Sequence, residues 1–418
     1  MKKFLFGTTA LAAVGFAVLA SAPANAQTAP APGFRSNAGF TVGISGYARQ
    51  FVGVTSNKNA GQTVQDGKID QMSDWRPIFN FSMPLANGLT AGAVLQFAPL
   101  NNTATSTGAT RRQWSFVSGA FGQVQLGMAD GVAAQMNVGG AEQFTGGAVK
   151  NGGKIYDTIT APSGNFAGIV TNTNADIYDN RPGNKINYFS PRFSGFQIGG
   201  SYTPEQASGR DGALPTSTTQ YRNIMEVSAN YVNTLGGVGL RAYGGYKHLG
   251  EPSAVGTTDS IRNFHKDAKW YGFGAGVNYM GFDIGGSYAK MKDGRLNTTG
   301  TTTTAAALGT VTNDGNAYEF GVNYTFGAFG VGVNYFKGEN EAGTADATTG
   351  AVVRQVNGDD KRSGISLSGR YVMGPGVNLE AILFQVKQTT GLAASTGFVT
   401  TDRSMKANGA MTALILSF

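Results

Sequence analysis

Apolar and polar residues alternate with a period of two along most of this chain, from residue 39 to its end. In residues 39 to 54, for example, Phe40, Val42 and Ile44 fall on one face and Thr41 falls on the other. This period is that of a β-strand with one apolar face and one polar face. The sequence therefore predicts an all-β protein built from amphipathic strands.

The same alternation recurs in about sixteen stretches of roughly ten residues each. The predicted strands are residues 39–54, 75–85, 89–97, 111–118, 123–130, 184–193, 197–204, 223–233, 238–249, 268–280, 283–292, 316–326, 331–337, 362–372, 377–388 and 403–418.

Short and long connectors alternate between these strands. The short ones have the composition of tight hairpin turns and are residues 86–88, 119–122, 194–196, 234–237, 281–282, 327–330 and 374–376. The long polar ones are roughly residues 55–73, 98–110, 131–183, 205–222, 250–267, 293–315, 338–361 and 389–402. Seven short and eight long connectors join sixteen antiparallel strands and leave both ends of the chain on the side of the short turns.

Two kinds of all-β fold fit this pattern. A closed barrel in a membrane turns the apolar faces to lipid and leaves no unpaired strand edge, whereas a soluble sandwich or propeller turns the same faces inward. Charged residues make up 14% of the chain, compared with about 25% in soluble domains. The composition favours a sixteen-stranded transmembrane β-barrel, with the soluble fold as the alternative.

The N-terminus has the pattern of an export signal. Lys2 and Lys3 precede an apolar run, and SAPANA then supplies a cleavage site that would make Gln27 the first mature residue. We therefore expect a signal peptide at residues 1–26, a lead segment at 27–38 and the barrel at 39–418. Cysteine is absent, so neither disulfides nor thiolate ligands are expected.

The last strand carries a resemblance to a known family. Phe418, Leu416 and Leu414 share its apolar face, which places an aromatic residue at the rim of the membrane. With a signal peptide and sixteen amphipathic strands, the chain resembles the Gram-negative general diffusion porins, and most closely the trimeric porins of alphaproteobacteria. The resemblance implies location in the outer membrane, a homotrimer, contact with lipopolysaccharide, and recognition of Phe418 by the barrel assembly machinery.

The same resemblance implies a constriction in the barrel. In the family, the third long loop folds into the lumen and places acidic residues opposite a wall of arginines. Here that loop is residues 131–183, and its candidate acids are Glu142, Asp157, Asp176 and Asp179. Strand parity predicts five arginines that face the lumen, namely Arg49, Arg76, Arg111, Arg241 and Arg370. Arg112 shares parity with Trp114 and Phe116, so it is expected at the outer interface instead.

These features predict an outer-membrane pore for passive passage of ions and small hydrophilic solutes. A substrate-selective channel for sugars or anions is the main alternative, and a barrel that acts as an adhesin or structural protein is a third. Nothing points to an enzyme, because His248 and His265 have no partner pattern and no hydrolase or nucleotide-binding motif occurs. Scattered basic residues and a net charge of +7 give no nucleic-acid stripe. No cofactor is required, although carboxylates in 67–74 and 357–364 leave open a loop-bound Ca²⁺.

Overall fold

The computed structural model describes the strands and the short turns of the chain. The described residues are 34–35, 39–59, 69–98, 109–139, 183–205, 221–250, 267–292, 310–345, 352–354, 360–389 and 404–418. The predicted signal peptide and most of the predicted lead segment lie outside these ranges.

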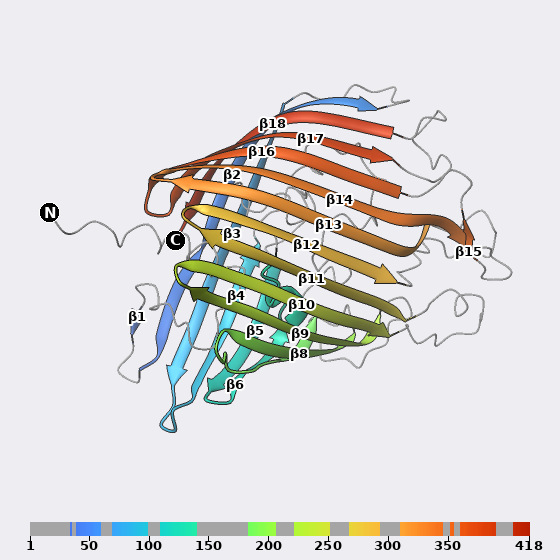
Figure 1. Ribbon diagram of the computed structural model, residues 1–418. Coiled ribbons are helices and arrows are strands. Elements are labelled where there is room, and N and C mark those ends of the chain that lie inside the picture. Colours follow the sequence, from blue (N-terminus) through green and yellow to red (C-terminus); the bar gives the residue numbers. More distant parts are fainter. Residues whose placement is uncertain are drawn as a thin grey trace.

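Within the described ranges, one antiparallel sheet contains 18 strands, sixteen of which form the wall of a barrel (Figure 1). The wall strands are β2 (Thr41–Asn59), β3 (Ile69–Pro84), β4 (Thr90–Ala98), β5 (Ala109–Gly119), β6 (Gly122–Met128), β7 (Asn184–Phe189), β8 (Phe196–Glu205), β9 (Arg222–Leu235), β10 (Val238–Gly250), β11 (Ala268–Tyr279), β12 (Phe282–Lys292), β13 (Thr310–Phe326), β14 (Phe329–Ala345), β16 (Asp360–Gly374), β17 (Val377–Thr389) and β18 (Ser404–Ser417). The two short strands are β1 (Phe34–Arg35), which pairs with the start of β2, and β15 (Val352–Arg354), which pairs with the end of β14.

The sheet closes on itself. Each wall strand pairs with its neighbour along the chain, and the last strand, β18, pairs with β2 from Ser417 opposite Tyr47 to Met405 opposite Asn59. Closure satisfies the backbone of every wall strand inside the sheet, as a lipid environment requires. The predicted sixteen-stranded barrel is confirmed.

The strands extend further than their amphipathic parts. Strand β3 begins at Ile69, where the prediction began at residue 75, and β14 continues to Ala345, where the prediction stopped at 337. Period-two alternation is needed only where one face meets an apolar phase, so the polar extensions beyond that zone give no signal in the sequence. No helix in the described part of the chain is long and apolar enough to cross a membrane.

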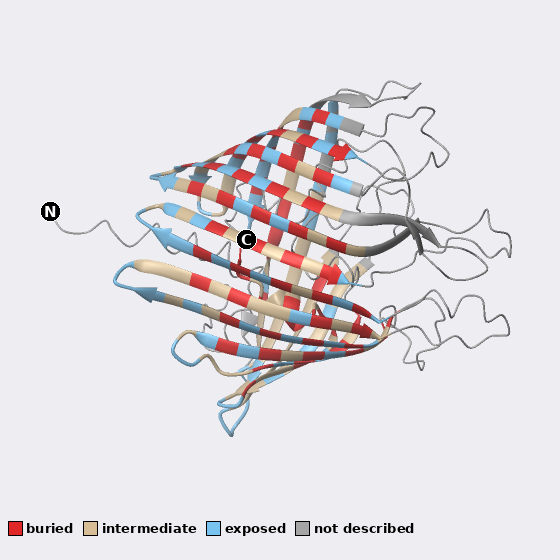
Figure 2. Cartoon of the chain, turned by 45° about the vertical axis from the view of Figure 1, so that its right-hand side comes forward, coloured by how far each residue is buried: buried red, intermediate tan, exposed pale blue. Residues whose placement is uncertain are grey.

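Exposure alternates along the strands in the way the sequence pattern requires (Figure 2). Phe320 and Leu367 point outward and are 54% and 52% exposed, while their neighbours Glu319 and Ser366 point inward and are buried. An apolar outer face and a polar inner face are therefore present over most of the wall.

One part of the inner face is apolar rather than polar. We call it the inner apolar strip, and it comprises the buried residues Phe51, Phe336, Ile382, Phe384, Val386, Met411, Ala413 and Ile415. The strip covers the lumenal side of β14, β17, β18 and β2. Strands β17 and β18 are apolar on both faces, so alternation there does not separate an inner side from an outer one. The expectation that the polar faces of the strands line the lumen is therefore wrong for this part of the wall.

After β6 the chain leaves the wall and turns into the lumen. It forms one short helix, α2 (Val132–Gln135), which contacts β7, β8, β9 and β10. Its Val132 and Met136 pack against Phe189, and Ala133 packs against Trp270. The first described residues of the third long connector thus lie on the inner wall of the barrel. Residues 140–182, the rest of that connector, lie outside the described ranges.

Candidate functional site

Four arginines come together on the lumenal side of β2, β3 and β5. Arg49 and Arg76 flank the ring of Tyr47, with their Cζ atoms 3.8 and 5.5 Å from its centroid. A cation placed over an aromatic face is stabilised by the ring quadrupole, so Tyr47 fixes two like charges in one place. Arg111 and Arg112 on β5, beyond the intervening strand β4, complete the group, which we call the arginine cluster.

Two aspartates partly neutralise this cluster. The Arg76 Nε donates to Asp74 Oδ1 at 3.0 Å, and the hydroxyl of Tyr47 donates to Asp74 Oδ2 at 3.4 Å. Asp130 takes the corresponding place beside Arg112: the Nε of Arg112 donates to its Oδ1 at 3.0 Å, and a second guanidinium nitrogen pairs with Oδ2.

The position of Arg112 corrects the prediction from strand parity. It faces the lumen, where its Nη1 donates to Gln96 Oε1 at 2.9 Å. Trp114 and Phe116 face inward with it, since Phe116 pairs with the buried Gln125. In β5 the aromatic face points into the barrel and the polar face, with Gln113 and Ser115, points outward. The pattern identified which residues share a face but assigned that face to the wrong side.

Arg111 belongs to the cluster for a different reason. Gln96 pairs with Arg112 and Phe97 pairs with Thr110, so Arg111 is the extra residue of a β-bulge. Bulges locally change the direction of side chains. Adjacent residues of a regular strand point to opposite faces, but at this bulge both Arg111 and Arg112 reach the lumen. Arg111 interacts electrostatically with Arg76, Arg112 and Asp130 there.

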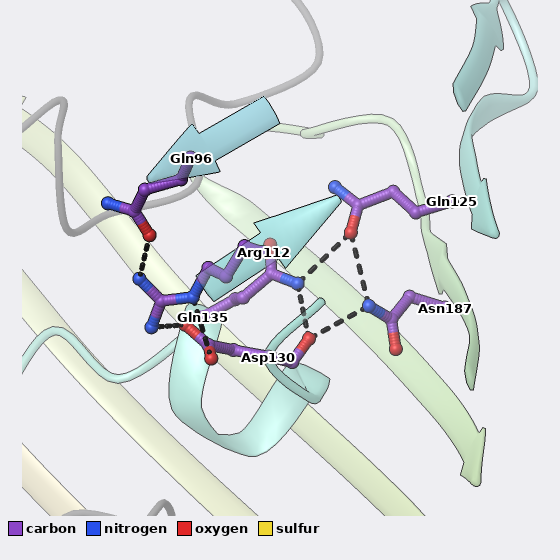
Figure 3. Close-up of polar contacts among 6 residues, drawn as sticks. All are labelled: Gln96, Arg112, Gln125, Asp130, Gln135 and Asn187. Carbon is purple, nitrogen blue, oxygen red and sulfur yellow. Dashed lines mark hydrogen bonds and ion pairs between the residues drawn. The ribbon is translucent and has the colours of Figure 1, made fainter. Parts of the chain in front are cut away.

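Polar side chains hold the root of the third long connector, residues 129–139, beside this cluster (Figure 3). Asp130 contributes its carbonyl oxygen, which accepts from Gln135 Nε2 at 2.6 Å and from Asn187 Nδ2 at 2.9 Å. The same two amides also donate to Gln125 Oε1, at 3.0 and 3.1 Å. The network links β6 and β7 to the connector and fixes Asp130 where its carboxylate meets Arg112.

The surroundings of Asp130 shift its acidity. Burial by itself would raise the pKa of its carboxyl group, but Arg112, with Lys185 and Arg111, outweighs burial and holds the pKa below its usual value. Asp130 is therefore a fixed negative charge at neutral pH.

Across the root, the wall supplies further partners. The Val132 amide donates to Ser201 Oγ at 2.8 Å, and Asn230 Nδ2 donates to the Met136 carbonyl at 3.0 Å. Helix α2 is thereby fastened to β8 and β9 as well as to β6 and β7.

The other predicted arginines lie apart from the cluster. Arg241 on β10 faces the lumen and forms an ion pair with Asp283 at 2.6 Å. Arg370 on β16 stands opposite Glu380 of β17 in the strand register. Both are within a few residues of short turns. The five predicted arginines thus do not form one wall, because Arg241 and Arg370 face other acids on other strands.

The remaining predicted positions are placed as follows. Glu142, Asp157, Asp176 and Asp179 lie outside the described residues. Of the predicted Ca²⁺ stretches, residues 69–74 and 360–364 are described, and Asp74 there pairs with Arg76. Phe418 is 58% exposed, and its backbone pairs with Gly46 through both its N–H and its carbonyl, which continues the pairing of β18 with β2. Its apolar neighbours Leu414 and Leu416 also point outward.

The site is a charged zone of the lumen. Among the described residues, the cluster joins four arginines and the buried Lys185 to two aspartates, which leaves an excess of positive charge. No group of three or more potential metal ligands occurs in the described ranges. Sequence reasoning missed Tyr47 as the support of Arg49, and it missed Asp74 and Asp130 as the partner acids.

Comparisons with known proteins agree with the barrel fold. A family model described as Gram-negative porin matches residues 7–391. An uncharacterised protein of Rickettsia conorii is 24% identical over 318 residues, which cover 63% of this chain and 70% of that protein. The trimer form of OmpT from Vibrio cholerae has a TM-score of 0.55 at 15% identity and covers 91% of this chain and 99% of that one. An anion-selective porin from Comamonas acidovorans has a TM-score of 0.54 at 16% identity and covers 91% of this chain and all of that one.

Proposed function

Because the chain belongs to the Gram-negative porin family, and so forms a pore for passive diffusion across the outer membrane, we propose that its arginine cluster makes this pore prefer small anions. The single observation that carries the proposal is that, in the described part of the chain, guanidinium groups outnumber carboxylates beside the connector root. A water-filled passage between low-dielectric walls raises the energy of any ion, and fixed charges determine which sign is tolerated. The proposed role is transport without catalysis.

A salt-gradient measurement tests this preference. We expect the unmodified channel in a planar bilayer to give a reversal potential of the sign for anions. The triple variant R49Q/R76Q/R111Q should shift that potential towards cations, because it removes three of the four cluster charges. The matched control is R241Q/R370Q, which removes two lumenal arginines that face acids elsewhere and should shift the potential less. An unchanged reversal potential in the triple variant would reject the arginine cluster as the selective element.

A sugar-selective channel has weaker support. Such a channel needs a continuous line of aromatic rings along the passage, but Tyr47 on β2 lies across the barrel from Tyr243 and Trp270, which are on the neighbouring strands β10 and β11. Trp270 is also fully buried against Ala133. Liposome swelling with sugars of graded size should therefore show a rate that falls with size and does not depend on sugar identity.

We further propose that the protein works as a homotrimer that uses β2 to β5 as its contact face. Elsewhere the outer wall carries exposed aromatic rings, as expected for contact with lipid, including Phe196, Phe273, Phe282, Tyr318, Phe320, Phe329 and Tyr371. The outer face of β2 and β3 is mixed: it carries the exposed Trp75, but there Ser73 Oγ also donates outward to Gln50 Oε1 at 2.6 Å. On β5, Gln113 and Ser115 are also exposed. Polar side chains in this position favour another protein surface over hydrocarbon.

The proposal extends to assembly. Phe418 would serve as the residue that the barrel assembly machinery reads, since it is exposed at the end of the strand that closes the sheet. Deleting it should lower the amount of barrel found in outer membranes of cells, while folding of the purified chain in detergent changes little. Equal loss in both systems would assign Phe418 a structural role alone. The outer rim of the barrel would contact lipopolysaccharide.

A further inference from the structure

Glu226 lies where helix α2, at the start of the third long connector, contacts β9. It belongs to β9, and its side chain faces the lumen and is only 1% exposed. We propose that Glu226, supported by Lys247, is a positioning residue that holds the connector root on the wall and so sets the open width of the pore. The inference rests on the proposed pore function and adds the side chains that keep the passage at a constant size.

Glu226 contacts both the connector root and Lys247, and we call these two contacts together the latch. Its Oε2 accepts the backbone N–H of Ala133 at 3.0 Å, and its Oε1 lies 3.3 Å from the Nζ of Lys247. Lys247 stands directly opposite Glu226 in the pairing of β9 with β10. A carboxylate taken out of water needs a compensating charge, and Lys247 supplies it from the adjacent strand. The pair therefore presents one ionised acceptor to the connector.

The backbone on both sides is shaped to this contact. A Cβ atom added at Gly131 would overlap the Glu226 carboxylate, so only glycine lets the carboxylate lie against the connector. A Cβ added at Gly199 of β8 would lie 2.6 Å from the Sδ of Met136, so the Met136 side chain would have to move from its place on the wall. Absence of side chains on both partners lets α2 lie directly on the wall.

Among the described wall contacts of α2, Glu226 supplies the charged one and the others are neutral. Ser201 and Asn230 also bind the root, but each does so through an uncharged group. Hydrogen bonds to an ionised acceptor are shorter and stronger than neutral ones. Losing the Glu226 acceptor would also leave the Ala133 N–H buried and unpaired. The root should consequently detach more often when this one contact is removed.

Two double variants isolate the contact. E226L/K247M and E226Q/K247M both remove the buried charges, but only glutamine keeps an oxygen that can accept the Ala133 N–H. Because the chain has no cysteine, A133C provides a unique reporter that is fully buried while α2 stays on the wall. Reaction of A133C with a water-soluble maleimide then measures detachment of the root independently of channel activity.

We expect A133C to react about tenfold faster, or more, in E226L/K247M than in E226Q/K247M, since the reaction follows the opened population. In bilayers without the reporter, E226L/K247M should show a larger and more variable single-channel conductance, while E226Q/K247M should match the unmodified channel. The control E205Q alters a second buried lumenal ion pair, Glu205 with Arg222, and should change neither readout.

Equal labelling in the two double variants would overturn the latch. Faster labelling of E226L/K247M with an unchanged conductance would overturn the link between the root and pore width. If the unmodified protein formed no channel, the proposed function would fail, but the labelling comparison would still decide the latch. Should E226L/K247M not fold, G131A replaces it, because the added methyl group displaces the carboxylate from the connector side and leaves the wall sequence unchanged.

Discussion

At the scale of single residues, Arg112 and Asp130 depend on each other. Their side chains are 14% and 20% exposed, so water screens the pair only weakly. Asp130 also anchors the connector root through its carbonyl oxygen. One residue therefore couples the charge of the lumen to the placement of the segment that enters it.

Replacing Asp130 tests this coupling. At neutral pH, D130N should increase the preference for anions and lower the free energy of unfolding by about 1–3 kcal/mol, because it removes a charged hydrogen-bond acceptor. Reversal potentials and denaturant unfolding in detergent measure the two effects. D74N is the control, since it neutralises the other acid of the cluster without touching the connector root.

The pH dependence of this difference has a defined sign. Because the pKa of Asp130 is lowered in the folded protein, its contribution is complete above the unfolded value of about 4 and is lost only as pH falls through the lower folded value. The unmodified protein and D130N should therefore converge in stability only under strongly acidic conditions. Convergence already at pH 6 would contradict a lowered pKa.

Only part of the cluster could be predicted from the sequence. Arg49 and Arg76 follow from strand parity, because their strands have one clearly apolar face. Arg112 does not, since β5 turns Trp114 and Phe116 inward and a bulge at Arg111 interrupts the alternation. Asp130 closes the predicted strand 123–130, but β6 ends at Met128, and the contact of Asp130 with Arg112 depends on how the chain turns after β6.

At the scale of elements, the seam between β18 and β2 depends on one glycine. Gly46 has φ of +136°, and a Cβ added there would overlap the carbonyl oxygen of Arg76. Its N–H and carbonyl pair with Phe418 at 2.8 and 3.1 Å. The backbone conformation at Gly46 therefore lets β2 pair with β3 on one side and with the end of the chain at Phe418 on the other.

G46A should weaken closure of the barrel. A side chain at this φ is strained by about 1–3 kcal/mol before the overlap with Arg76 is counted. We expect a lower yield of the fast-migrating folded form on unheated gels and a lower melting temperature. G43A is the matched control on the same strand, because a Cβ there meets Asn80 at an ordinary 3.9 Å. Equal behaviour of the two variants would show that Gly46 is not required.

The elements themselves were largely predictable. All sixteen wall strands and all seven short turns occur where alternation and turn composition place them. The ends of strands such as β3 and β14 were not, because their extensions lie beyond the zone in which one face must be apolar. The inner apolar strip was missed for a related reason: β17 and β18 are apolar on both sides, so composition alone does not reveal what faces the lumen.

At the scale of the whole molecule, the outward-facing residues differ in composition between two groups of strands. Exposed aromatic rings recur along β8 to β16, whereas on β2 to β5 exposed Gln and Ser side chains lie among apolar ones such as Val54 and Trp75. A barrel surrounded by lipid on all sides has no reason for this asymmetry. The difference fits a trimer in which β2 to β5 are shielded from lipid.

S115W should reduce trimer formation, because a bulky ring on β5 would prevent close approach of another copy. V277W places the same ring on β11, where Val277 is 42% exposed, and should leave the trimer intact. Light scattering of the purified protein in detergent measures the molecular mass of each. A normal trimer in S115W, or dissociation in V277W, would move the contact face away from β5.

The pairing of β18 with β2 also has a consequence for biogenesis. Since the first and last long strands are neighbours in space, no intermediate that lacks residues 404–418 can complete the cylinder, and both β17 and β2 would keep an open edge. Contacts so distant in sequence form late in folding. An interrupted polypeptide that lacks this strand therefore stays an incomplete sheet with exposed edges, which proteases can remove. It does not form an unregulated pore in the outer membrane.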